Sequence, residues 1–544
     1  MNPTTARGTA SSDLATGASG WALAALSGAL MAAPCLDTRL FLLGWVAFVP
    51  LLYALRGRTL GQSYLLGVVT GLVFWVAMFY WLPEFVHRIK EYPAPYNYLL
   101  ALLLYSYAAQ AFGLIAFALQ WLHRRTRLPD LLTVPVVFVA VFSAFPMLFY
   151  LRLGEGQSAF SVAIQAADIT GAHGLDFMMA LSSVLAYRLL SGGWRRLAGP
   201  GAIGALACLG LWFGYGVIAL RHWDQEIATW SSKRIGIVQP NDQVSLAIPP
   251  PPKGYTRGYP PEMEMTENLA RQGAELVVWP EARYKGYFEH SIVRNEYIAR
   301  IAAAGTSLLF HDLEQDESAG KRRYFNSAVL LDADGDQLGV YRKVKRVAFG
   351  EYLPVVAEVG FLRERAERYL GDFLREITPG EGHQSFTVAG MRLVPKICYE
   401  SAFPLFMAES IGDDGAGKVL AILSQDGWFG ETRQPYQHLW GSVLRAVESR
   451  VPVVHAINNG PSGVILPSGR IVHQAPAFVQ TAFVTDVPYS AESGGSFFSR
   501  HPTAFLWFIY LGFSGLMLIS AIRPIGAERQ EGMPGNIAQS DSPD

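Results

Sequence analysis

The chain has 544 residues, of which 51% are hydrophobic and only 16% are charged, and its formal net charge at pH 7 is −1. Because soluble proteins carry about 25% charged residues, a large part of this chain must avoid water. The small net charge gives no reason to expect a nucleic acid as partner, and three cysteines provide no disulfide framework.

The N-terminal 20 residues are rich in Ser, Thr, Gly and Ala and show no hydrophobic period, which predicts a disordered tail. Residues 21–35 have the length of a signal-peptide core, and Cys35 could mark a lipoprotein cleavage site. Pro34 stands where such a site needs a small residue, so an uncleaved first membrane helix is favoured. Cys35 and Cys208 lie in apolar runs and are interpreted as core residues.

Hydrophobic stretches then recur through the first 220 residues and once more near the C-terminus. They lie at about 39–55, 62–82, 98–122, 131–150, 161–190, 198–220 and 503–522. Most reach the roughly 20 residues that a bilayer-spanning helix needs. With residues 21–35 they predict about eight transmembrane helices, seven of them in a membrane domain at 21–220.

The positions of Arg and Lys predict the orientation of these helices. Basic residues follow the second, fourth, sixth and eighth stretches, at 56–58, 124–127, 195–196 and 523. Since basic loops stay in the cytoplasm, both termini are expected there, with a disordered cytoplasmic tail at 523–544. The segment between the seventh and eighth helices is then extracytoplasmic.

This extracytoplasmic segment, about 232–490, alternates strand-like and helix-like runs. The pattern predicts an α/β layered domain, whose functional sites usually lie beyond strand ends. The proline-rich stretch at 249–262 is interpreted as a solvated surface loop, with a lid that gates the site as the alternative.

Three residues of complementary chemistry come at or just after strand ends. Glu281 follows the run 277–280, Lys343 follows 339–342, and Cys398 follows 394–397. A carboxylate can take the proton of a thiol, and an ammonium can stabilise a tetrahedral oxyanion, so the three could form an acyl-transfer site. Each alone has a structural reading: a helix cap, a solvated cation and a buried cysteine.

Longer motifs surround these residues and carry a family resemblance. They are WPE at 279–281, YFNSA at 324–328, YRK at 341–343, FGEYLP at 349–354, ICYES at 397–401, DGWFG at 426–430, PYQH at 435–438 and NNG at 458–460. With them the segment resembles the carbon–nitrogen hydrolase (nitrilase) superfamily. The chain from about 21 to 522 resembles the bacterial apolipoprotein N-acyltransferases.

The resemblance implies a fold and a set of roles. The fold would be a polytopic α-helical membrane domain joined to a nitrilase-like αββα sandwich, an α/β domain. Glu281 would act as base, Lys343 as oxyanion stabiliser and Cys398 as nucleophile. Three further residues would support this triad: Glu351, Tyr399 and Glu400.

The resemblance also implies a reaction and a place. In a bacterial inner membrane, with the catalytic domain on the periplasmic side, a phospholipid (typically phosphatidylethanolamine) would give its acyl chain to Cys398 as a thioester. The α-amino group of an apolipoprotein's diacylglyceryl-cysteine would then take it. Because water hydrolyses thioesters, a screened site at the bilayer surface favours aminolysis. No cofactor is implied, and the eleven His residues show no zinc-type spacing.

Several positions near the triad depart from the family pattern. Gln425 replaces an asparagine, and Lys396 takes an apolar position on the strand face that Cys398 shares. We hypothesise that Lys396, Arg283 and Lys285 add positive potential near the thiol or the lipid phosphate. The alternative is solvated surface charge.

Rival enzyme readings stay open. A Cys–His–Asn hydrolase would use Cys398, either His438 or His455, and Asn458, although an Asn-Asn-Gly turn is reason enough for Asn458. A membrane-bound amidase would keep the triad but release a free acid or ammonia, and an acyltransferase could use another acceptor.

A non-catalytic scaffold or transporter is the alternative of another class. Charged residues in mid-span would mark a transport path, and the one such cluster is Asp168, His173 and Asp176. These residues are interpreted instead as the interfacial start of the sixth helix.

Overall fold

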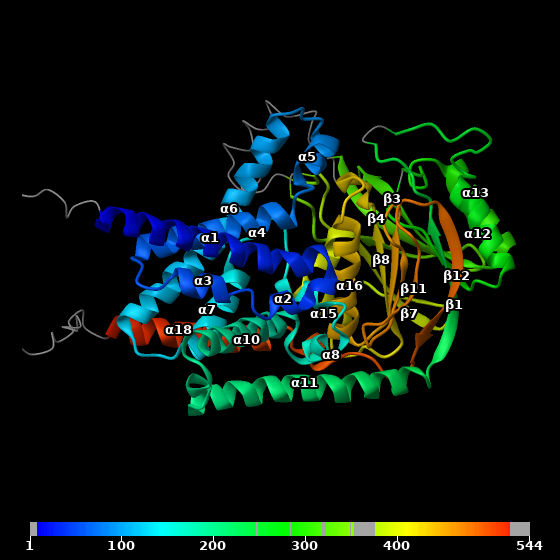
Figure 1. Cartoon of the computed structure of the whole chain (residues 1–544). Helices are drawn as coiled ribbons and strands as arrows, with labels where there is room; N and C mark the ends of the chain where they lie inside the picture. The colour runs from blue at the N-terminus through cyan, green and yellow to red at the C-terminus, as the bar shows by residue number, and fades with distance from the viewer. Residues whose placement is uncertain are drawn as a thin grey trace, which may run out of the picture.

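The computed structural model describes residues 8–245, 248–282, 284–317, 322–348, 350–352 and 376–522. Figure 1 shows a bundle of long helices joined to an α/β domain. The bundle comes from both ends of the chain: α1, at its start, and α18, at its end, lie in the same bundle.

Seven long helices dominate the bundle. They are α1 (Gly8–Leu36), α4 (Leu60–Met78), α6 (Tyr96–Arg125), α7 (Asp130–Ala144), α10 (Ala172–Gly192), α11 (Pro200–Ile227) and α18 (Ala504–Ile522). Within the described residues, five helical segments are long and apolar enough to cross a membrane: 18–36, 60–78, 96–125, 200–227 and 504–522. The shorter apolar helices 38–54 and 130–144 fall below that length. The predicted count of about eight spans is therefore not confirmed.

Local breaks explain the difference from the predicted spans. The stretch expected at 161–190 is divided into α8 (Ser161–Ile164), α9 (Ala167–Thr170) and α10, and Gly171 at φ +64° ends α9. Only glycine adopts that backbone conformation at little steric cost, so the chain turns where hydropathy alone shows one continuous run.

The N-terminal tail differs from its prediction. Disorder was predicted over 1–20, but α1 begins at Gly8. Alanines in this segment favour helix, and the apolar half of α1 extends the same helix. Residues 1–7 and the tail predicted at 523–544 lie outside the described residues. Cys35 is buried as expected, whereas Cys208 is only half-buried.

Two six-stranded sheets form the α/β domain. Their strand orders are β12-β1-β2-β3-β4-β5 and β11-β10-β9-β8-β7-β6. The strands are β1 (Ser231–Gln239), β2 (Leu276–Val278), β3 (Ser307–Asp316), β4 (Arg323–Leu331), β5 (Gln337–Arg342), β6 (Phe386–Val388), β7 (Met391–Ile397), β8 (Lys418–Ser424), β9 (Val453–Ile457), β10 (Gly463–Ile465), β11 (Ile471–Gln474) and β12 (Thr481–Tyr489). β1, β2 and β3 are parallel neighbours, as are β7, β8 and β9.

The two sheets pack face to face between helices. Their inner faces share one apolar core, to which β2 gives Leu276 and Val278 and β7 gives Leu393 and Ile397. The outer face of the first sheet packs on α12 (Pro261–Arg271) and α13 (Ser291–Ala304). The outer face of the second packs on α15 (Pro404–Ile411) and α16 (Gln434–Ser449). The predicted αββα sandwich is confirmed.

The bundle and the α/β domain share one continuous hydrophobic core. Residues of α15 and α16 belong to the same buried cluster as the interior of the bundle. Ion pairs reinforce this junction: Arg450, just after α16, bonds Asp168 of α9 at 2.7 Å, and both side chains are buried. Asp168 thus faces the α/β domain and lies outside the interior of any long helix.

Candidate active site

A cavity of about 610 Å³ lies where the sandwich meets the bundle. Glu281, Lys343 and Cys398 all line it. Its opposite wall is apolar and comes from the bundle side of the chain, between α4 and the segment after α7. That wall includes Met78, Phe79, Trp81, Phe85, Ile89, Phe149 and Leu151. The cavity therefore joins a polar floor to a hydrophobic wall.

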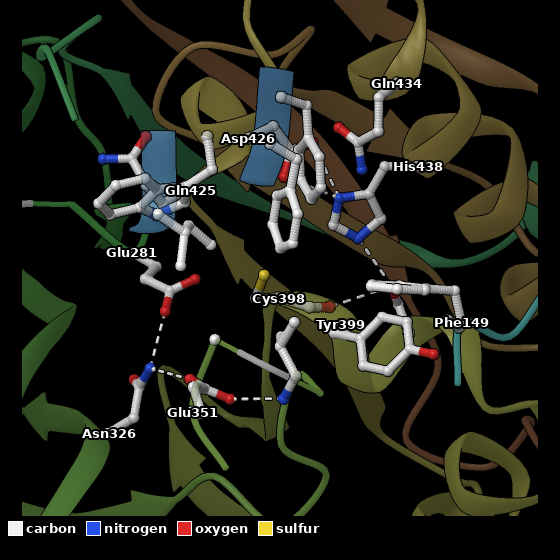
Figure 2. Close-up of a pocket in the computed structure, with 18 of the residues that line it drawn as sticks. Phe149, Glu281, Asn326, Glu351, Cys398, Tyr399, Gln425, Asp426, Gln434 and His438 are labelled. Atoms are coloured by element: carbon white, nitrogen blue, oxygen red, sulfur yellow. Dashed lines mark hydrogen bonds and ion pairs between the residues drawn. The ribbon is translucent and has the colours of Figure 1, made fainter. Parts of the chain in front are cut away.

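The three predicted site residues meet because their strands end at one edge of the sandwich. Glu281 follows β2, Lys343 follows β5 and Cys398 follows β7. β2 and β5 run in the same direction through β3 and β4, so their carboxyl ends share an edge. Figure 2 shows Cys398 at the centre of the cavity, with Glu281 and Glu351 to one side and His438 to another.

Two carboxylates hold the Lys343 ammonium. Its Nζ lies 2.8 Å from Glu351 Oε1 and 4.0 Å from Glu281 Oε1. Asn326 donates from Nδ2 to Glu281 at 2.7 Å and to Glu351 at 3.1 Å (Figure 2). Burial lowers the pKa of Lys343, but the two carboxylates and Cys398 outweigh it and raise the pKa above its ordinary value. Lys343 is therefore a permanent cation.

The Cys398 thiol is protonated at rest. Burial raises its pKa well above the ordinary value, and Glu281 raises it further, against the opposing charge of Lys343. A buried thiol becomes nucleophilic only when a base takes its proton. The neighbouring carboxylate of Glu281 is the group placed to do so.

Cys398 has an unusual backbone conformation. Its φ is +53°, in the left-handed region, which costs a residue with a side chain about 1–2 kcal/mol. It begins the short helix η5 (Cys398–Ala402) directly after β7. This sharp strand-to-helix turn presents the thiol to the cavity.

Glu400 fixes the turn to the loop that carries Lys343. Its buried carboxylate accepts hydrogen bonds from the backbone N–H of Ile397 at 2.8 Å and of Val344 at 2.7 Å. The hydroxyl of Tyr341 donates to both carboxylate oxygens at 2.8 Å. Two sheets are thereby joined within three residues of Cys398.

Tyr399 connects the site to the bundle. Its hydroxyl accepts from the backbone N–H of Tyr150 at 2.6 Å and donates to the carbonyl of Leu148 at 3.2 Å. Its ring packs edge-on against Phe149. The segment that forms part of the apolar wall is thus held to the residue beside Cys398.

Two of the three basic residues singled out in the sequence, Lys285 and Lys396, are buried. Lys285 is buried and paired with Glu262, with its backbone N–H bonded to Asp312. Lys396 is fully buried, and its Nζ donates to the carbonyl of Pro395 and lies 4.4 Å from the centre of the Tyr341 ring. Neither side chain lines the cavity. The alternative of solvated surface charge is wrong for both, because both are buried. Arg283 lies outside the described residues.

The residues of the Cys–His–Asn alternative have other partners. His438 bonds Asp426 through Nδ1 at 2.9 Å and Ser401 through Nε2 at 2.7 Å. His455 contacts Ser442, and Asn458 donates to the carbonyl of Asp242 and to Gln425. Figure 2 shows His438 directed towards Asp426. None of these bonds is to the Cys398 thiol.

Sequence reasoning assigned no role to three polar residues of the cavity: Asn326, Ser401 and Asp426. Asn326 lies in the YFNSA motif, Ser401 in ICYES and Asp426 in DGWFG. The motifs therefore marked these residues, but they did not show which side chains the residues bond. The first part of the proline-rich loop also reaches the site, because Ile248 and Pro249 line the cavity.

Comparisons with known proteins identify similar chains. The family model for the apolipoprotein N-acyltransferase N-terminal domain matches residues 27–185, and the carbon–nitrogen hydrolase model matches residues 261–491. An apolipoprotein N-acyltransferase of Geobacter metallireducens is 28% identical over 89% of this chain and 92% of its own length. One of Bdellovibrio bacteriovorus is 25% identical over 76% and 78%. The chain is thus similar over most of its length to apolipoprotein N-acyltransferases.

Other apolipoprotein N-acyltransferases match a smaller part of this chain. One from Rhodopseudomonas palustris is 35% identical over 39% of each chain. Among solved structures, a mutant amidase from Nesterenkonia sp. AN1 is 19% identical, covers 48% of this chain and 94% of that chain, and gives a TM-score of 0.34. The family predicted from the motifs is confirmed.

Proposed function

We propose that this chain transfers an acyl chain from a membrane phospholipid to the N-terminal diacylglyceryl-cysteine of apolipoproteins, through a thioester on Cys398. One observation carries the proposal: a single cavity joins the three residues of the predicted triad to an apolar wall from the membrane part. A soluble amide substrate needs no such wall, whereas an acyl chain does.

Acylation of the enzyme is the first step. Glu281 takes the proton of the Cys398 thiol while the sulfur attacks the ester carbonyl of the phospholipid. The Lys343 ammonium stabilises the oxyanion that forms. When the tetrahedral intermediate collapses, the carbon–oxygen bond breaks, and the lysophospholipid alkoxide takes the proton from Glu281.

Transfer to the acceptor is the second step. The neutral α-amine attacks the thioester carbonyl and gives a proton to Glu281, and the carbon–sulfur bond breaks. Glu281 then returns that proton to the Cys398 thiolate. The apolar wall at Trp81, Phe85 and Phe149 keeps water from the thioester, which favours the amine over hydrolysis.

The proposed topology has eight crossings. These are the five long apolar helices, the short apolar segments 38–54 and 130–144, and α10. Exposed apolar side chains such as Leu211 on α11 and Phe508 on α18 would face lipid. Figure 1 places the start of α1 and the end of α18 at the end of the bundle remote from the α/β domain. This supports termini on the side of the membrane opposite the catalytic domain. The proposal puts the termini in the cytoplasm, the catalytic domain on the periplasmic side of an inner membrane, and phosphatidylethanolamine in the role of donor.

A two-stage assay with the full-length protein in vesicles tests the proposal. Phosphatidylethanolamine with a fluorescent acyl chain should label Cys398 through a bond that neutral hydroxylamine cleaves, and Cys398→Ala should abolish labelling. A diacylglyceryl-cysteine peptide added next should take the label as an amide.

The other outcomes identify the rivals. A folded wild-type protein that is never labelled would indicate a scaffold or transporter. Label released as free fatty acid, with no amide formed on the peptide, would indicate a membrane-bound hydrolase. Label that passes to other amines but not to the peptide would indicate a different acceptor. Each of these results would overturn the proposal.

A further inference from the structure

A chain of hydrogen bonds leads from α16 to the backbone of Cys398. The carboxylate of Asp426 lies 2.9 Å from Nδ1 of His438, and Nε2 of His438 lies 2.7 Å from Oγ of Ser401. Ser401 in turn donates from Oγ to the carbonyl oxygen of Cys398 at 3.2 Å. All three side chains line the active-site cavity, yet the triad chemistry uses none of them.

The hydrogen-bond partners of Ser401 and Asp426 bear on the protonation of the His438 ring. Ser401 has one hydroxyl hydrogen; where it goes to the Cys398 carbonyl, Oγ accepts from Nε2–H of His438. Asp426 also accepts from the hydroxyl of Ser424 at 2.6 Å. It is therefore an acceptor carboxylate that needs Nδ1–H as donor. In this arrangement both ring nitrogens of His438 carry a proton, and the imidazole is positively charged.

The surroundings of His438 favour this positive charge. Burial lowers the pKa of His438, but Asp426 outweighs burial and raises the pKa, and Glu281 and Glu155 add to the effect. The His455 ring lies edge-on at 5.0 Å, and its own pKa falls well below the ordinary value through burial and the charge of His438. On its own helix, Arg445 contacts the turn by donating to the carbonyl of Ser401 at 3.5 Å.

We propose that His438 is a positioning residue for the acyl transfer: as an imidazolium held by Asp426, it fixes the carbonyl of Cys398 through Ser401. Glu400 fixes the chain just before Cys398, at Ile397, and Ser401 fixes the peptide group just after it. Together they hold Cys398 at its left-handed φ of +53°, from which the thiol faces Glu281. The proposal rests on the proposed function and deepens it.

Deprotonation of His438 would release this turn. A neutral imidazole has one N–H, so either the bond to Asp426 is lost or Ser401 must donate to Nε2 and free the Cys398 carbonyl. The ordering is present below the pKa of His438 and is lost as pH rises through it. Misplacing a nucleophile by about 1 Å can cost about 100-fold in rate.

The experiment measures single-turnover acylation of Cys398 by the fluorescent phospholipid, in full-length protein in vesicles, between pH 6 and pH 10. The wild-type rate should fall on the alkaline side. Ser401→Ala should lower the plateau about 10-fold or more and remove this alkaline fall. Ser401→Thr keeps the hydroxyl and should recover most of the rate. Asp426→Asn should move the fall to lower pH, because the neutral amide holds the imidazolium less strongly.

Two controls keep the outcome decisive. Lys396→Met should keep the alkaline fall, which excludes Lys396 as its source. Thermal unfolding checks that each variant is folded. If Ser401→Ala folds poorly, the test rests on the rate of Ser401→Thr and on the pH profile of Asp426→Asn. The inference would be overturned if Ser401→Ala kept the wild-type rate and pH profile, or if Asp426→Asn did not shift the alkaline fall. Acylation of Cys398 would still support the proposed function in either case. A wild-type protein without any Cys398 adduct would overturn both.

Discussion

Two buried lysines near Cys398 differ in the groups that surround their charge. Lys343 has two carboxylates within 4.0 Å, which hold its charge where an oxyanion would form. Lys396 has a backbone carbonyl and two aromatic rings as its close partners. Burial lowers the pKa of Lys396 to about 8, with Glu400 opposing the shift. The carboxylates compensate the buried charge of Lys343, whereas the buried charge of Lys396 lowers the stability of the folded protein.

We predict that Lys396→Met stabilises the protein at pH 7. The folded-state pKa of about 8 lies below the ordinary lysine value of 10.5, so the charged ammonium destabilises the folded protein at every pH below about 8. That cost, about 3 kcal/mol at most, declines between pH 8 and pH 10.5. The apparent melting temperature of the variant should exceed that of the wild type at pH 7, and the gap should close by about pH 10.

Lys418→Met is the matched control. Lys418 is a half-buried lysine whose Nζ donates to the carbonyls of Ser410 and Ile411, so its removal leaves those acceptors without a donor and should not stabilise. Cys398 alkylation should show the same pH dependence in Lys396→Met as in the wild type. A lower melting temperature for Lys396→Met at pH 7 would contradict the prediction.

The meeting of Glu281, Lys343 and Cys398 in one cavity could be predicted from the sequence, but the place of Lys396 could not. Glu281, Lys343 and Cys398 each end a short apolar run, and parallel strands bring such ends together. A period of two places Lys396 on the face of Cys398, but that rule assumes extended backbone. Cys398 at φ +53° leaves the strand, and its side chain no longer follows the alternation.

Glu400 links the turn between β7 and η5 to the loop after β5. Its carboxylate accepts from four donors, which belong to Tyr341, Val344, Lys345 and Ile397. A glutamate three residues after a helix N-cap commonly bonds the N-cap N–H, so the bond to Ile397 could be predicted from local sequence. The bonds to the loop after β5 join residues more than 50 positions apart, which no local pattern reveals.

We therefore predict that Glu400→Gln impairs both folding and acylation. A glutamine amide offers one acceptor oxygen, and its NH₂ group would face backbone N–H donors. Leaving buried donors unpaired costs about 1–3 kcal/mol each, so the apparent melting temperature should fall by several degrees, and single-turnover acylation should drop at least 10-fold. The control is Glu409→Gln on α15, whose exposed carboxylate lies 3.8 Å from His383. Equal melting temperatures for wild type and Glu400→Gln would refute this role.

The contacts between the bundle and the sandwich could not be predicted from the sequence. The cluster of Asp168, His173 and Asp176 is visible in the sequence, but the partner of Asp168 is Arg450, 282 positions away. Likewise the count of spans depends on where helices break, and Gly171 ends α9 inside an apolar run. Hydropathy measures the cost of contact with water, and it does not report which apolar segments pack on protein.

We predict that Arg450→Met loosens this junction. Arg450 is fully buried and bonds Asp168, the side chain and carbonyl of Gln165, and the carbonyl of Pro467. Removing one partner of a buried pair costs about 3–5 kcal/mol because the other charge stays buried. The control is Arg470→Met, whose exposed pair with Asp224 also joins α11 to the sandwich and should contribute under about 1 kcal/mol. Thermal unfolding of the two variants in the same detergent decides, and equal losses in melting temperature would show that burial at Arg450 carries no extra stability.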